Sequence, residues 1–218
     1  VSYLESRRLL KASRWLPYLA TPQGANAVNL SKTRVVIVGA GQAGGRAAEA
    51  LRAAGHSGPI TLVGEEAHLP YERPQLSKAI LLDSEPNPAF IRSSGDWAGL
   101  DVTLSTSSRA VAADIDRREI GLKDGRTFPF DQLLLATGTR PRRMAELEGT
   151  ALPVSYLRCM DDALALRSAL QPGKKVVLVG GGVIGLEVAS AAVARGCHVA
   201  VIEKAETVLP QIGSPSLS

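Results

Sequence analysis

The stretch Val35-Val36-Ile37-Val38-Gly39-Ala40-Gly41-Gln42-Ala43-Gly44 decides the fold. Four β-branched residues in a row are typical of a parallel strand that is buried on both faces. An alanine-rich stretch follows as far as Ala54 and stops before Gly55, which predicts a helix with a glycine just past its C-terminus. A second apolar run at residues 60–63 completes the order strand, glycine-rich turn, helix, strand. The sequence therefore predicts a βαβ unit in a parallel sheet.

The glycines of this turn have the spacing G-x-G-x-x-G, and each has its own physical task. Gly39 permits a tight turn, Gly41 lets a pyrophosphate approach the backbone, and Gly44 lets the helix pack close to the strand. The helix N-terminus presents free N–H groups to the phosphates. Glu65 follows at the end of the second strand, where a carboxylate can accept hydrogen bonds from ribose hydroxyls. We therefore expect a dinucleotide at this turn.

The same arrangement returns later in the chain. Residues 176–179 (VVLV) lead into Gly180-Gly181-Gly182-Val183-Ile184-Gly185, and a helix to Arg195 and a strand at residues 199–202 are expected before Glu203. The Glu203 carboxylate would bond a free 2′-hydroxyl and repel a 2′-phosphate. This favours NADH over NADPH, although the neighbouring Lys204 weakens the preference.

The segment between the two units predicts an interruption of the parallel sheet. Short alternating runs that predict strands lie at residues 102–104, 110–115, 119–122 and 126–128. Asp124-Gly125 marks a hairpin, and the sheet is expected to resume at residues 133–135. A strand at residues 155–158 and a helix at residues 161–170, with Asp161 near its N-cap, are expected next.

Composition and charge restrict the class of protein. The 218 residues are 45% hydrophobic and 21% charged, an ordinary globular composition large enough for one big or two small domains. The net charge of +4 arises in the first 32 residues, which hold five basic side chains and one acid, so no basic domain face for nucleic acid is expected. No run reaches the ~18 apolar residues of a membrane span, so no membrane partner is expected.

The two cysteines, Cys159 and Cys197, have no Cys/His ligand spacing around them, so we expect no metal site and no disulfide framework. A reduced, cytoplasmic location is the simplest interpretation. Residues 1–33 resemble a twin-arginine or transit leader, but Arg14 and Pro17 interrupt the apolar region. We expect a disordered extension there.

Two dinucleotide folds require two dinucleotides, and hydride transfer from a nicotinamide to a flavin is the simplest chemistry that links them. The two glycine motifs, the Ala136-Thr137-Gly138 strand end and the loop Arg73-Pro74-Gln75-Leu76-Ser77-Lys78 resemble the FAD-dependent pyridine nucleotide oxidoreductases. More narrowly, they are similar to the ferredoxin, rubredoxin and putidaredoxin reductase branch. The resemblance implies an α/β protein with a Rossmann-like FAD-binding domain over residues 34–145, which carries a small antiparallel β excursion, and a partial Rossmann-like NAD-binding domain over residues 146–218.

The resemblance also implies cofactor contacts at the positions that match the family motifs. Those it places at FAD are Gly39, Ala40, Gly41, Ala43, Gly44, Glu65, Arg73, Lys78, Ala110, Ala136, Thr137, Gly138 and Arg158, the last from a Tyr-Leu-Arg strand. The cofactor-binding positions at and after the second glycine motif are Gly180, Gly182, Ile184, Gly185, Glu187 and Glu203.

A catalytic pair is implied as well. The family places Lys78 near the flavin N5 edge and pairs it with Glu187, just after the second glycine motif. A cation there stabilises charge that develops on the reduced ring, and the carboxylate limits the cost of burying the cation. The alternative is that Lys78 is a surface lysine and Glu187 a charge on a helix face.

The absence of cysteine from residues 73–82 argues against the disulfide reductases of this superfamily, because they carry a dithiol there. An external one-electron carrier, an iron–sulfur ferredoxin or a rubredoxin-type protein, is therefore the expected acceptor. Three functions stay open. They are an NADH:ferredoxin-type reductase present as its N-terminal portion, a non-catalytic remnant that binds FAD or nothing, and a related NADH oxidase, nitrite-reductase-like or apoptosis-inducing-factor-like flavoprotein.

Overall fold

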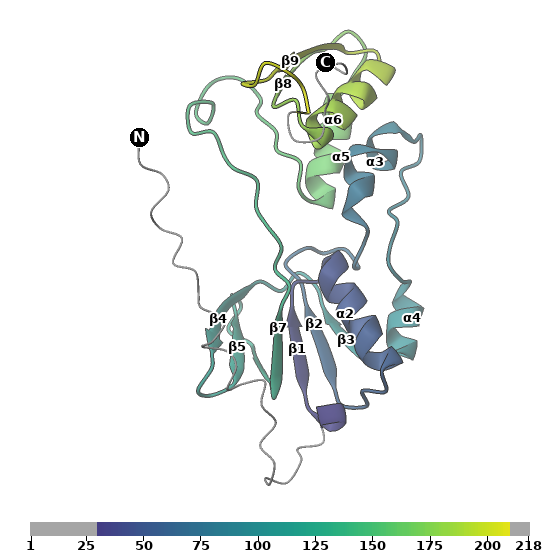
Figure 1. Ribbon diagram of the computed structural model, residues 1–218, viewed down its shortest axis with the longest axis vertical. Helices are drawn as coiled ribbons and strands as arrows, with labels where there is room; N and C mark the ends of the chain where they lie inside the picture. Colours follow the sequence, from purple (N-terminus) through teal and green to yellow (C-terminus); the bar gives the residue numbers. More distant parts are fainter. Residues whose placement is uncertain (1–29, 210–218) are drawn as a thin grey trace. The chain divides into compact units, whose positions relative to one another are not determined.

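The computed structural model describes residues 30–209 (Figure 1). The chain divides between Leu30 and Ser31, and nearly all described residues belong to the unit that begins at Ser31. The predicted extension at residues 1–33 lies outside the described residues up to position 29. The 3₁₀ turn η2 (Leu30–Lys32) is described, and the Ser31 carbonyl accepts the amides of Ser57 and Gly58.

A four-stranded parallel sheet with the order β3-β2-β1-β7 forms the first half of the structure. Its strands are β1 (Val35–Val38), β2 (Ile60–Val63), β3 (Val102–Ser105) and β7 (Gln132–Leu135). All four residues of β1 are buried, as the unbroken β-branched run predicts for a central parallel strand. Helix α2 (Gln42–Ala53) joins β1 to β2 and ends before Gly55, as the sequence predicts.

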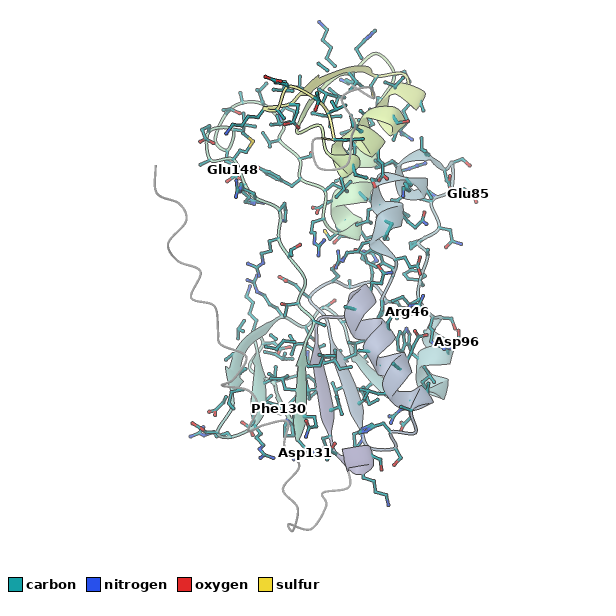
Figure 2. The ribbon with its side chains drawn as sticks, viewed as in Figure 1. Arg46, Glu85, Asp96, Phe130, Asp131 and Glu148 are labelled. Carbon is teal, nitrogen blue, oxygen red and sulfur yellow. The ribbon has the colours of Figure 1, made fainter. Side chains whose placement is uncertain are left out.

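Alternate residues of β1 enter two different cores, because successive side chains of a strand point to opposite faces. Ile37 packs with Ala48 of α2 and with Trp97 of α4 (Ser94–Gly99). On the other face, Val36 and Val38 belong to a cluster that includes Phe130, which Figure 2 labels.

The predicted antiparallel excursion covers this second face. Its strands are β4 (Ala110–Asp114), β5 (Glu119–Leu122) and β6 (Thr127–Pro129), in the order β4-β5-β6. Ile120 and Leu122 of β5 supply its buried side chains to the cluster. The expected hairpin is present: Gly125 has a φ of +87°, and its amide bonds the Leu122 carbonyl.

The second crossover follows the prediction as well. Strands β8 (Lys175–Val179) and β9 (His198–Ile202) pair in parallel, and α6 (Val183–Ala194) joins them. The other elements here are η3 (Arg73–Ser77), α3 (Ala79–Leu82) and α5 (Met160–Ala169). Leu81 of α3 packs against Val188 and Ala191 of α6, which places the 73–82 segment beside the second crossover.

The predicted strand at residues 155–158 is wrong, because this segment has no regular structure. Leu157 packs into two apolar clusters, and the Tyr156 hydroxyl accepts the Met144 amide at 2.8 Å. The apolar spacing therefore reflects side-chain packing and not backbone pairing.

The start of α5 also differs from the expectation. Cys159 is the N-cap, and the Asp162 carboxylate, not that of Asp161, accepts the Cys159 amide at 2.9 Å. Asp161 instead contacts His68, as described below. Within residues 30–209, none of the helices is long and apolar enough to cross a membrane.

Candidate functional site

A groove of about 1030 Å³ lies where β1, β2 and β7 end. In open parallel sheets, ligands bind outside the carboxyl ends of the strands, at such a position. The predicted FAD residues that line the groove are Gly39, Ala40, Gly41, Ala43, Glu65, Arg73, Ala110, Ala136, Thr137, Gly138 and Arg158. Gly44, Lys78 and the residues of the second crossover lie outside this lining.

The glycines of the first turn differ in what surrounds them. Gly39 has a φ of +116°, a backbone conformation that L side chains rarely adopt, and a Cβ there would overlap the Ala136 carbonyl. A Cβ at Gly44 would overlap the Gly39 carbonyl oxygen. A Cβ at Gly41 would lie 3.6 Å from the Arg73 guanidinium, an ordinary contact. The fold therefore requires Gly39 and Gly44, whereas Gly41 leaves room on the side of the groove.

The helix that leaves this turn begins with an open N-terminus. Gly41 is the N-cap of α2, and within the described residues no side chain caps it. Free backbone N–H groups at a helix N-terminus attract anions, and phosphates above all. One end of the groove can therefore accept a phosphate.

Two arginine side chains extend over the glycine backbone of this groove. The Arg73 guanidinium lies over Gly41, and that of Arg158 lies over Gly138, where a Cβ would be only 2.8 Å from it. Arg73 also donates to the Arg158 carbonyl at 2.6 Å, which connects the two arginines. The groove can therefore hold an anionic ligand between positive groups.

A carboxylate that the sequence reasoning missed holds Arg73 in place. Glu66 accepts hydrogen bonds from Arg73 at 2.6 Å and from the Tyr71 hydroxyl at 2.5 Å. Burial, together with the Glu66 hydrogen bond, raises the pKa of Tyr71 far above its ordinary value, so Tyr71 stays a neutral donor. The only signal in the sequence was the second glutamate of the Glu65-Glu66 doublet after β2.

Glu65 itself forms an ion pair with Arg109 at 3.1 Å, and both side chains are exposed. Exposed ion pairs contribute little to stability, so Glu65 can exchange Arg109 for another partner. This is compatible with a hydrogen bond to a ribose.

A second contact that the sequence analysis did not predict lies in the groove, between His68 and Asp161. His68 Nε2 lies 2.9 Å from the Asp161 carboxylate, and Asp161 and Cys159 both line the groove. Burial raises the pKa of the Cys159 thiol, so a reactive thiolate is not favoured there. Both Cys159 and Cys197 are free, and residues 30–209 contain no cluster of three or more potential metal-ligating side chains.

The second glycine turn repeats the geometry of the first. Gly180 has a φ of +110°, and a Cβ at Gly185 would overlap its carbonyl oxygen. Within residues 30–209, a Cβ built at Gly182 would have no heavy atom within 4 Å apart from those of its immediate neighbours in the chain. Ile184 is exposed at the start of α6. The turn therefore favours glycine at position 180 for its backbone conformation and requires it at position 185 for close packing, whereas the space at Gly182 is open.

Glu203 lies against this second turn. Its carboxylate accepts the Ala205 amide at 2.9 Å and the Gly181 amide at 2.6 Å. These two backbone hydrogen bonds lower the pKa of Glu203 below its ordinary value. Glu203 is thus an ionised acceptor beside the glycine backbone.

The structure brings Lys78 and Glu187 together, with Lys78 Nζ 3.2 Å from Glu187 Oε1. Ser77 donates a hydrogen bond to the other carboxylate oxygen at 2.5 Å. The pKa of Glu187 is lowered first by Ser77 and then by Lys78, which together outweigh the opposing effect of burial. The pair is ionic, and its task at a flavin stays a prediction.

These features define an α/β protein with two glycine-rich crossovers of the dinucleotide-binding type. A family profile described as "Pyridine nucleotide-disulphide oxidoreductase" matches residues 33–216. The chain belongs to this family, and its fold is the Rossmann-like one of the FAD-dependent ferredoxin reductases among its structural neighbours.

Relatives with assigned functions share the same branch. The ferredoxin–NAD(+) reductase component of the p-cumate 2,3-dioxygenase system of Pseudomonas putida is 47% identical over 81% of this chain and 44% of its own length. Rubredoxin-NAD(+) reductase of the same species is 42% identical over 84% of this chain and 48% of its own length. The chain thus spans less than half the length of these relatives.

Solved structures of ferredoxin-type reductases resemble this chain as well. The structure of a covalent putidaredoxin reductase–putidaredoxin complex matches with a TM-score of 0.78 and 37% identity, over 85% of this chain and 45% of that one. A ferredoxin reductase from Rhodopseudomonas palustris matches with a TM-score of 0.79 and 38% identity, over 85% of this chain and 46% of that one.

Proposed function

We propose that this chain holds FAD and NADH in a reductase that delivers electrons to an iron–sulfur ferredoxin or a rubredoxin-type carrier. The observation that carries the proposal is the placement of one short segment between the two glycine crossovers. Arg73 at its start lies over the first glycine turn, and Lys78 at its end is paired with Glu187 of the second crossover. The named relatives and the family support the same reaction class.

The groove at the first turn fits the chemistry of FAD. The open N-terminus of α2 and the guanidinium groups of Arg73 and Arg158 suit a pyrophosphate. Glu65 would accept hydrogen bonds from the adenosine ribose, and residues 136–138 would line the flavin side. Gly41 leaves the backbone accessible to the ligand, in a turn whose close packing requires Gly39 and Gly44.

The second turn would hold NADH. The glycine backbone from Gly180 to Gly185 would receive its pyrophosphate, with Ile184 and Gly182 at the start of α6. Glu203 would bond the 2′-hydroxyl of the ribose, and its negative charge opposes a 2′-phosphate. To do so, the carboxylate shares or exchanges its present backbone donors.

FAD held in this groove would supply the redox chemistry, which is uptake of a hydride from NADH and release of the two electrons one at a time. Lys78 would hold a positive charge where negative charge develops on the reduced ring, which is the effect of a preorganised electrostatic group. Glu187 would keep that ammonium group oriented and partly neutralised.

The acceptor is proposed to be a separate protein. The segment 73–82 contains no cysteine, so it offers no dithiol to relay electrons, although the family description mentions disulphides. The rise in the pKa of Cys159 argues against that thiol as a substitute. A cytoplasmic location belongs to the same proposal.

The test is a visible spectrum of the purified full chain after incubation with FAD and removal of the free cofactor. We expect bound flavin bands that bleach when NADH is added without oxygen, and a smaller rate with NADPH at the same concentration because of Glu203. The reduced protein should then reduce an added ferredoxin or rubredoxin faster than it reduces oxygen.

A chain that stays colourless would refute the FAD proposal. Flavin bands that NADH does not bleach would instead favour the FAD-binding remnant. Reoxidation by oxygen or nitrite that is faster than by either carrier would favour the third class of flavoprotein.

A further inference from the structure

The Lys78–Glu187 pair has a third member. Ser77 precedes Lys78 in the chain, and its hydroxyl donates to Glu187 Oε2 while Lys78 contacts Oε1. Two consecutive residues therefore hold the two oxygens of one carboxylate. A carboxylate with both oxygens engaged has a fixed orientation, whereas one held by a single ammonium group can rotate.

The three side chains differ in how deeply they are buried, and the difference indicates which of them holds the carboxylate most rigidly. Ser77 is 5% exposed, the Glu187 side chain is 27% exposed and the Lys78 side chain is 51% exposed. An ion pair with a half-exposed lysine is a weak orienting force by itself, because water screens it and the long side chain is mobile. The short, buried Ser77 hydroxyl is the rigid contact of the set.

The backbone supports this division. Ser77 is the last residue of η3, and α3 begins at Ala79 and packs with Leu81 against α6, which carries Glu187. The position of the Ser77 hydroxyl is therefore set by helix packing and not by solvent. Leu76, the neighbour of Ser77, is buried in a separate cluster and adds to this rigidity.

We infer that Ser77 is a positioning residue, which fixes the Glu187 carboxylate and through it the Lys78 ammonium group. This inference rests on the proposed function for its effect on catalysis, but not for its effect on Glu187. Ser77 itself has no assigned contact with either cofactor. The glycine motifs do not predict this role of Ser77, because its partner Glu187 lies on α6, 110 residues further along the chain.

The other ionisable groups on the elements around α6 do not replace this contact. Arg73 of η3 is bonded to Glu66 and to the Arg158 carbonyl. Lys175 and His198 stand at the first residues of β8 and β9, at the strand ends opposite the glycine turn from which α6 starts. Among the described residues, Ser77 and Lys78 are the groups that shift the titration of Glu187.

The first experiment follows the Glu187 carboxylate directly. The full chain is labelled with ¹³C-glutamate and titrated by NMR, and the Glu187→Gln variant identifies the resonance. Because Ser77 lowers the pKa of Glu187, we expect the midpoint to move to higher pH in Ser77→Ala and to stay low in Ser77→Thr. A midpoint that does not move in Ser77→Ala would overturn the inference whether or not the chain is a reductase.

The second experiment measures flavin reduction by NADH against pH in stopped flow. Ser77→Ala should slow the step by roughly tenfold, the usual effect of a lost hydrogen bond to a charged group, and should move the acidic limb of the profile to higher pH. In the Glu187→Gln background, the same change should have no further effect, because Ser77 acts through Glu187.

The matched control is Ser93→Ala, which removes another serine–carboxylate hydrogen bond, to Asp96 at 2.7 Å in α4. It should leave the rate and the pH profile unchanged. An equal rate loss from Ser77→Ala with and without Glu187 would refute positioning through Glu187. Absence of flavin reduction in the unmodified chain would refute the proposed function, and the NMR titration would still decide the assignment of Ser77.

Discussion

The glycines of the two turns fall into two groups according to what a methyl group would meet. At Gly44 and Gly185 it would overlap a backbone carbonyl of the same turn, and backbone cannot move aside as a flexible side chain can. At Gly41 and Gly182 the space is open or bounded by an arginine side chain. The first group is therefore required by the fold, whereas the fold leaves the second group free, and the proposed cofactor sites would be the reason for glycine there.

This division predicts opposite results for two alanine variants. Gly44→Ala should lower the free energy of unfolding by about 2–3 kcal/mol, the usual cost of forcing an extra methyl group into a packed site. Gly41→Ala should leave stability nearly unchanged but weaken FAD binding by roughly tenfold or more, about 1.4 kcal/mol or more. Chemical denaturation and FAD titration measure the two effects.

The control for these variants is Gly95→Ala in α4, where a Cβ would have no close neighbour except Ser93 Oγ at 3.9 Å. Alanine exceeds glycine in helix propensity by at most about 1 kcal/mol, so this variant should be neutral or slightly stabilised. A Gly41→Ala protein that binds FAD as tightly as the unmodified chain would contradict the ligand role of that glycine.

The residues of the site were predictable only where their spacing carries the chemistry. The spacing of Gly39, Gly41 and Gly44 predicts a dinucleotide-binding turn, because each position has a distinct steric task. Glu66 could not be found in this way. It holds Arg73 and also accepts the Met160 amide from 94 residues away at 3.4 Å, and such a contact leaves no local pattern.

At the level of elements, two arginines join three helices. Arg195, the C-cap of α6, donates to the carbonyls of Leu170, Leu81 and Arg167 at 3.0–3.1 Å. Arg167 of α5 donates to the Ile80 and Leu81 carbonyls at 3.2 Å. The last carbonyls of α3 lack partners within a short helix, and cations satisfy them and favour that end of the helix dipole.

We therefore expect Arg195→Lys to destabilise the chain although it keeps the charge. Lysine is a point charge without the planar fork of five donors, so it cannot serve three carbonyls in fixed directions. The expected loss is about 2 kcal/mol in the free energy of unfolding. Arg117→Lys is the control, because Arg117 is 80% exposed and 3.8 Å from Asp114, and its effect should stay within about 0.5 kcal/mol. Equal stability of the two variants would refute the role of Arg195.

The elements that the sequence predicted best are the unbroken apolar runs that lead into a glycine turn, both the fully buried β1 and the partly exposed β8. An unbroken run such as residues 35–38 has few alternatives to a central parallel strand, and the βαβ pattern repeats it with the same spacing. Residues 155–158 were predicted incorrectly because a short run of this kind shows which side chains can be buried but not whether the backbone has a strand to pair with. The start of α5 shifted for a similar reason, since Asp161 has a distant partner in His68.

At the scale of the whole molecule, the groove joins parts of the chain that are far apart in sequence. Its first wall comes from residues 38–43, 63–67, 73, 107–110 and 136–140, and its second from residues 158, 159 and 161. The Glu66 carboxylate lies between them, because it holds Arg73, and Arg73 donates to the Arg158 carbonyl. A ligand in the groove therefore contacts both walls, and its binding should stabilise the fold as a whole.

This coupling gives a prediction for thermal unfolding. At an FAD concentration 100 times the Kd, binding to the folded chain alone adds about 2.7 kcal/mol to its stability, and the melting temperature rises accordingly. Glu66→Gln removes the charge that orients Arg73, so at the same FAD concentration the rise should be clearly smaller. The quantity compared is the increment caused by FAD, since the variant also changes the stability of the free chain.

The control is Glu85→Gln. Glu85, which Figure 2 labels, is exposed in the segment after α3 and lies outside the groove lining. It removes the same charge from the chain, so it separates the loss of a carboxylate from the loss of this particular contact. If Glu66→Gln and Glu85→Gln show the same FAD increment, Arg73 does not depend on Glu66 for its place at the ligand. A reduced increment in Glu66→Gln alone ties the two walls of the groove to one partly buried salt bridge.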